Sequence, residues 1–173
     1  MKNATKHLEQ VIQHIVEARQ TLRDFYSIRL PVPVPNPPVS ANELAALEEG
    51  LRRRKLPFPP SYRAFLTVCN GILAFDGRLD LLSTKQVLEP VDASLKTDFP
   101  MLSKFVIGSG NTSAFISFDP ETVSKSDEME VVWVMEDGGE FRYPDFRTLL
   151  QMYRDELQKN LAQKEADRRD LPD

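Results

Sequence analysis

The sequence is poor in residues that would brace a fold covalently or place it in a membrane. It has one cysteine, so no disulfide can form within the chain and its stability does not need an oxidising compartment. No apolar run approaches the roughly 20 residues of a membrane-spanning helix. Polar residues also interrupt the N-terminal stretch where a signal peptide would be apolar. We therefore expect a cytoplasmic protein without membrane association.

Residues typical of catalytic and metal centres are equally scarce. The two histidines, His7 and His14, lie two turns apart on one predicted helix, whereas a zinc site needs three or four ligands. We expect both on the surface. Cys69 falls on an apolar helix face, where cysteines are typically inert. We expect no enzyme activity, no cofactor and no bound metal.

Acidic residues are unevenly distributed along the chain. Residues 72–145 contain six basic and fourteen acidic residues, a net charge of −8, while residues 1–71 have a net charge of +4. An acidic segment argues against nucleic acid as a partner, because phosphates need basic counter-charges. It suits a basic protein partner, although solubility alone explains it equally well.

The length of 173 residues is enough for one domain with a sizeable core. Residues 1–30 have the apolar spacing of an amphipathic helix, and the proline-rich residues 31–38 predict a stiff extended connector. Residues 39–157 alternate helix and strand patterns and should form an α+β domain. Residues 158–173 are mostly charged, and we expect this C-terminal tail to fray.

Residues 58–71 are the stretch around which the predicted domain is organised. Pro59 and Pro60 suit the first turn of a helix, where the missing N–H groups have no partner anyway. Asn70 and Gly71 tolerate the left-handed backbone that ends a helix. The apolar stripe between these two signals has the spacing i, i+3, i+4, i+7, and its members are Tyr62, Phe65, Leu66 and Cys69.

Other signals complete the α+β pattern with a mostly antiparallel sheet. Ser40 and Glu43 form a capping box at a helix start, and Asp145 can cap the last helix. Residues 131–135 are apolar on both faces, which predicts a strand near the centre of the sheet. Trp133 in this strand could serve as a ligand platform, but core packing is the favoured interpretation.

These elements resemble the SUKH superfamily in their order and spacing. The resemblance covers roughly residues 40–157 and is carried by the 58–71 pattern, the strand pair within 108–119, the apolar strand 131–135 and a closing helix that begins at Asp145-Phe146. Phe58 stands where that family usually has leucine. The resemblance implies an antiparallel sheet surrounded by helices. Many bacterial members are immunity proteins that bind and block a toxin, often a nuclease.

The resemblance therefore implies an immunity protein whose partner is a toxin, with a basic nuclease domain as the expected partner and a monomer as the favoured state. A regulatory scaffold that binds a cellular protein is the alternative, because other members have that role. An enzyme or small-ligand binder is a third class, which a deep polar pocket would support. A neighbouring toxin gene would favour the first class.

Five carboxylates are candidate partner-binding residues. They occupy predicted turns or outward strand positions without an evident internal role, and carboxylates fixed on a rigid hairpin can mimic phosphates in a cationic cleft. The alternative interpretation is that they are solvated turn residues and that binding uses another face. The candidates are Asp76, Asp80, Glu136, Asp137 and Glu140.

Overall fold

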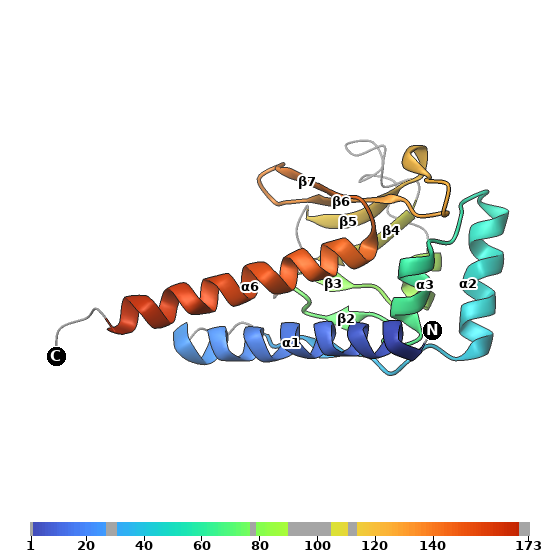
Figure 1. Cartoon of the computed structure of the whole chain (residues 1–173). Helices are drawn as coiled ribbons and strands as arrows, with labels where there is room; N and C mark the ends of the chain where they lie inside the picture. Colours follow the sequence, from blue (N-terminus) through green and yellow to red (C-terminus); the bar gives the residue numbers. More distant parts are fainter. Residues whose placement is uncertain (1, 27–30, 77–78, 90–104, 111–113, 170–173) are drawn as a thin grey trace.

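An antiparallel sheet forms the centre of the structure, a computed structural model that describes residues 2–26, 31–76, 79–89, 105–110 and 114–169 (Figure 1). The strands are β1 (Val34–Pro35), β2 (Ile72–Leu73), β3 (Leu79–Leu81), β4 (Phe105–Gly110), β5 (Phe115–Asp119), β6 (Glu130–Val134) and β7 (Glu140–Tyr143). The helices are α1 (Lys2–Tyr26), α2 (Ala41–Arg53), α3 (Pro60–Leu66), α4 (Thr84–Leu88) and α6 (Phe146–Arg169), with a short 3₁₀ turn η2 (Pro120–Thr122) after β5.

The strands lie in chain order from β1 to β7, and each neighbouring pair is antiparallel. The predicted α+β class with an antiparallel sheet is confirmed. The central position predicted for residues 131–135 is wrong, because β4 is the middle strand and β6 lies next to the edge strand β7. Burial on both faces requires only that each face be covered, so it does not fix a strand's place in the order.

Strand β6 is buried on both faces, as predicted. Val131 and Trp133 belong to the main core, which includes residues of the long helices. Val132 and Val134 point to the opposite face and pack in a second cluster with Val106 and Phe115 of β4 and β5. The side chains of these four β6 residues are at most 6% exposed.

The two long helices α1 and α6 pack side by side, with α1 below α6 as drawn in Figure 1. Ile15 of α1 and Leu157 of α6 are both buried in the main core. The predicted fraying from residue 158 differs from the structure, where α6 continues to Arg169. The division of the chain into four segments stays a prediction, although α6 crosses the expected boundary after residue 157.

The predicted helix within residues 58–71 is confirmed as α3. All four members of its apolar stripe are at most 1% exposed. The Phe65 ring packs against the Tyr62 ring and the Phe146 ring of α6, with centroid distances of 6.0 and 4.9 Å. The helix ends earlier than predicted, at Leu66, with Thr67 as a right-handed cap. Gly71 has the expected left-handed backbone, with a φ of +89°, but it lies in the loop between α3 and β2. The Tyr62 ring also packs against Phe105 of β4 and Phe118 of β5, so α3 joins α6 to the sheet.

The proline-rich connector is part of the sheet. Its strand β1 is the edge strand and pairs with β2, which is a position that tolerates proline. Beyond β1, the Asn36 backbone N–H donates to the Gly71 carbonyl (3.0 Å), and the Asn36 side chain donates to the Asn70 carbonyl (2.9 Å). The connector is thus fastened to the segment that follows α3.

A carboxylate from the loop before β6 caps the start of α3, which the sequence did not indicate. Glu128 accepts hydrogen bonds from the backbone N–H of Ser61 (2.8 Å) and from its hydroxyl (2.7 Å). The N-cap residue of α3 is Pro59, and no side chain at that position caps the helix. Glu128 therefore supplies, from 67 residues away, what an N-cap residue usually supplies.

Replacing Glu128 by alanine should lower the free energy of unfolding by about 1–2 kcal/mol, because a helix-start N–H and a part-buried hydroxyl lose their acceptor. Urea denaturation measures this change. Glu9→Ala is the matched control, since Glu9 is an exposed glutamate on α1 and its loss should cost less than about 0.5 kcal/mol. Equal urea concentrations at the midpoint of unfolding for the parent and the Glu128 variant would contradict the capping role.

Candidate partner-binding site

The five predicted carboxylates do not all lie at one site in the structure. Asp76, Glu136 and Asp137 line one open groove of about 410 Å³ beside Trp133. Asp80 lies in β3 opposite Ser109, and Glu140 begins β7. The structure therefore brings together three of the five candidates and does not place Asp80 or Glu140 among the residues lining that groove.

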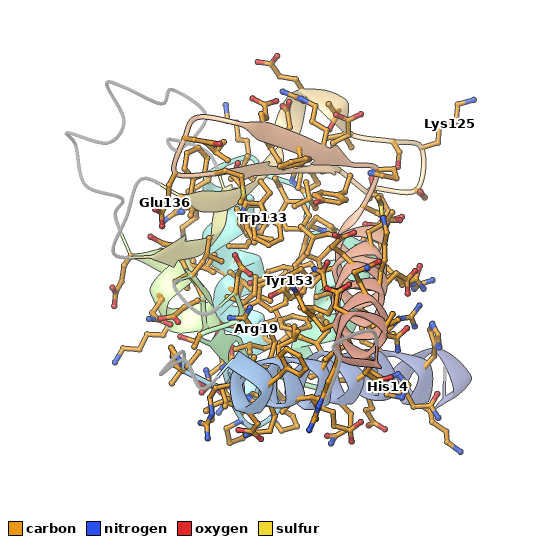
Figure 2. All side chains as sticks on the ribbon, turned by 90° about the vertical axis from the view of Figure 1, so that its left-hand side faces the viewer. His14, Arg19, Lys125, Trp133, Glu136 and Tyr153 are labelled. Atoms are coloured by element: carbon orange, nitrogen blue, oxygen red, sulfur yellow. The ribbon has the colours of Figure 1, made fainter. Side chains whose placement is uncertain are left out.

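A larger open space of about 570 Å³ shares its lining with the first. Together the two spaces form what we call the α1–α6 groove, which extends from the β6–β7 hairpin to the two long helices. The residues lining the larger space are Arg19, Leu22, Asp76, Trp133, Met135, Phe141, Tyr143, Met152, Tyr153, Glu156, Leu157 and Asn160. Figure 2 looks toward this side and shows Trp133, Tyr153 and Arg19 between the hairpin above and α1 below.

Two aromatic rings, those of Trp133 and Tyr153, line the floor of the groove, and the fully buried Phe75 ring packs against both of them. The Tyr153 ring lies 4.5 Å from the Phe75 ring and 5.6 Å from the Trp133 ring, and the Phe75 and Trp133 rings are 6.1 Å apart between centroids. Trp133 is 5% exposed, so most of its surface packs in the core, as favoured from the sequence. Its remaining surface still lines the groove.

A polar group of three side chains lies beside this floor. The Tyr153 hydroxyl donates to the Asp76 carboxylate (2.8 Å) and approaches the Phe75 carbonyl (3.1 Å). Arg19 forms an ion pair with Asp76 at 3.9 Å. Burial raises the pKa of Tyr153, and the Asp76 carboxylate raises this pKa further. The tyrosine is therefore a neutral donor at neutral pH.

Sequence reasoning missed Arg19 and Tyr153 as polar partners of Asp76. A signal for Arg19 was present, because it follows Ile15 by four residues and precedes Leu22 by three, which places a cation beside the apolar stripe of α1. A cation in that position needs a carboxylate partner. Nothing in the local sequence identified Asp76 as that partner, since the two residues lie on distant segments.

The expectation that the five carboxylates have no internal role is wrong for most of them. Asp80 accepts a hydrogen bond from the backbone N–H of Ala74 (2.5 Å), which follows directly after β2 and has a φ of +54°. Asp76 accepts from Tyr153, and Asp137 accepts from the Gly139 N–H (2.9 Å) within the hairpin turn. Short polar side chains at turns commonly bond to the backbone.

Glu140 belongs to an ionic network on another part of the sheet. Arg142 of β7 contacts Glu140 (2.6 Å), Asp119 of β5 (3.0 Å) and Glu130 of β6 (3.2 Å). The Arg142 side chain is 44% exposed, so each pair contributes little to stability by itself. The network nevertheless neutralises part of the charge that the sequence suggested for partner binding.

The described residues show little that could perform chemistry. No group of three or more histidine, cysteine, aspartate or glutamate residues in that part of the chain could hold a metal ion. Burial raises the pKa of Cys69 to about 12, and its thiol donates to the Gly71 carbonyl (2.8 Å). This thiol is therefore protonated at neutral pH and enclosed by the core. Among the helices described, none is long and apolar enough to cross a membrane.

Comparison with known proteins gives one result for the sequence family. A search of curated proteins finds no match. Residues 38–152 match the SMI1 / KNR4 family (SUKH-1), which is about two thirds of the chain and runs from the connector into the first third of α6. The match includes α3, every strand from β2 to β7 and the start of the last helix. The chain therefore belongs to the SMI1 / KNR4 family, SUKH-1.

Proposed function

We propose that this protein is an immunity protein that binds a bacterial toxin and neutralises it by occlusion, with a nuclease as the toxin. The observation that carries the proposal is the match of residues 38–152 to SUKH-1, a family known for toxin immunity proteins. The protein would act in the cytoplasm, as a non-enzymatic monomer. Neutralisation by occlusion needs only a stable surface that fits the toxin, with no catalytic group.

The distribution of charge supports a basic partner. The segment from residue 72 to 145 has a net charge of −8, and Glu136 and Asp137 lie exposed at the tip of the β6–β7 hairpin. A nuclease cleft is cationic because its substrate is anionic, and complementary charge raises the association rate of two proteins. Carboxylates on a short hairpin are also held in place before binding, which reduces the ordering cost.

Co-expression tests this proposal directly. The gene beside an immunity gene normally encodes its toxin, so the product of the neighbouring gene is expressed in a host with and without this protein. We expect growth to stop with the toxin alone and to continue when this protein is present. Cells that stop growing equally in both cases would contradict the proposal, provided that the protein is produced in folded form.

Variants of the hairpin tip refine the test. Replacing Glu136, Asp137 and Glu140 together by alanine should slow association with the toxin at low salt, with a smaller difference at high salt. The hairpin variant and variants of Asp76 and Asp80 need a stability measurement beside the binding measurement, because Asp76, Asp80 and Asp137 accept internal hydrogen bonds and Glu140 pairs with Arg142. Unchanged rates at low salt for the hairpin variant would exclude the acidic tip as a contact while leaving the immunity role open to the growth test.

A further inference from the structure

We propose that the α1–α6 groove binds a basic amphipathic segment of the partner polypeptide, with a lysine or arginine side chain lying against Trp133 and Tyr153 between carboxylates. The identity of the partner as a toxin rests on the proposed function, whereas the chemistry of the segment follows from the groove itself. The groove combines an aromatic floor, exposed apolar residues on two walls and a negatively charged rim.

The apolar part of the argument concerns Phe141 and Met152. They are 54% and 55% exposed, and both line the groove, Phe141 from β7 and Met152 from α6. Single exposed apolar residues are ordinary, but two on different walls of one groove create a site that apolar side chains of a partner can cover. Methionine adapts to partners of different shape because its side chain is flexible.

The charges around the groove determine which apolar segment fits. Of the described residues that line it, four are carboxylates and one is a cation. The cation is Arg19, which already pairs with one of the carboxylates. The carboxylates are Asp76, Glu136, Asp137 and Glu156. An acidic segment would be repelled here, whereas a basic segment would be attracted.

The aromatic floor also favours a cation over a neutral side chain. A lysine or arginine head group interacts favourably with the faces of tryptophan and tyrosine. Its aliphatic stem can pack along apolar side chains such as Met135 and Met152 while the charged end reaches the carboxylates. Trp133, Tyr153 and Glu136 surround the open space from β6, α6 and the hairpin (Figure 2).

Only part of the groove lies within the residues that match the family. The β6–β7 hairpin lies inside residues 38–152, but Arg19 and Leu22 of α1 and Glu156 and Leu157 of α6 lie outside them. The matched region therefore supplies the hairpin wall and Met152, and helical segments beyond it supply the rest of the other wall. We infer that these helical segments make the groove selective for the partner of this protein.

The single tryptophan of the chain makes the groove directly observable. Fluorescence of Trp133 in the full-length protein is followed during titration with a short amphipathic peptide of lysine and leucine, and with the same peptide carrying glutamate in place of lysine. We expect a saturable change with the lysine peptide that weakens as salt is added. We expect no change with the glutamate peptide.

Charge reversal at the rim tests the position of the site. The double variant Glu136→Lys, Glu156→Lys should weaken binding of the lysine peptide by about tenfold or more, because two attractive charges become repulsive. The control Glu9→Lys, Glu89→Lys has the same net charge and changes exposed residues that do not line the groove. It should weaken binding by less than about threefold, through the overall charge alone. Phe141→Ser tests the apolar wall separately and should also weaken binding.

Several results would overturn the groove proposal. One is that Trp133 fluorescence does not change with the lysine peptide. Another is that it changes equally with the lysine and glutamate peptides. A third is that the rim variant and its control weaken binding of the lysine peptide equally. The growth test separates this proposal from the proposed function. If the protein protects cells but fails the peptide test, the groove proposal is wrong and the immunity role stands. If the peptide test succeeds but no protection occurs, the groove binds basic segments and the immunity role is wrong.

Discussion

Replacing Phe65 by alanine is expected to lower the free energy of unfolding by about 3–5 kcal/mol, since a fully buried aromatic ring leaves a cavity that the core cannot close. Phe65 is 0% exposed and its ring packs between those of Tyr62 and Phe146. The loss would therefore loosen the contact between α3 and α6 as well as remove buried apolar surface. Urea denaturation monitored by circular dichroism measures the change.

The matched control for this prediction is Phe141→Ala. Phe141 is 54% exposed at the rim of the groove, so its removal should cost less than about 1 kcal/mol. The comparison holds the chemical change constant and varies only the burial. A cost below about 1 kcal/mol for Phe65→Ala, similar to that of the control, would show that α3 is not a main support of the core.

Replacing Gly71 by alanine should destabilise the protein by about 2–5 kcal/mol. Its φ of +89° is unfavourable for a residue with a side chain, at about 1–2 kcal/mol. An added Cβ would also lie only 2.6 Å from the Leu81 carbonyl oxygen and 2.9 Å from the Ser83 nitrogen. Backbone atoms cannot rotate away as a side chain can, so this overpacking should cost about 1–3 kcal/mol more.

Gly138→Ala separates the two causes of that effect. Gly138 has a similar φ of +83°, but a Cβ there would have no atom within 4 Å. Its replacement should cost only the backbone strain, about 1–2 kcal/mol. Thermal unfolding of both variants gives the comparison. If the two cost the same, the close approach of β3 to Gly71 does not limit the residue at this position.

Much of the local structure could be predicted because its causes are local. The capping box of Ser40 and Glu43 forms as predicted, and Asp145 accepts from the Thr148 N–H (2.7 Å) at the start of α6. Both rest on residues three positions apart. The buried stripe of α3 could be predicted as well, because helical periodicity over residues 58–71 specifies one buried face.

The groove could not be predicted because its residues come from distant segments. Arg19, Asp76, Trp133 and Tyr153 lie on α1, the turn after β2, β6 and α6, and the relative placement of these elements depends on packing over the whole domain. The order of the strands could not be predicted for the same reason. The apolar pattern of β6 shows that both of its faces are buried, but not which strands lie beside it.

The internal hydrogen bonds of the candidate carboxylates could not be predicted from the sequence either. Their positions on turns and outward strand faces were reasonable inferences from the period-two pattern. Hydrogen bonds from Ala74 to Asp80 and from Tyr153 to Asp76 are decided by the path of the turn and by a helix 77 residues away. For these two residues an internal role therefore accompanies any contact with a partner.

The most direct test of neutralisation by binding is a titration of the toxin's activity with this protein. The purified product of the neighbouring gene is assayed on its own substrate, nucleic acid in the case of a nuclease, while this protein is added in steps. The account predicts that activity falls to zero near a one-to-one ratio and that a stable complex can be isolated. Full toxin activity in the presence of a large molar excess of folded protein would contradict it.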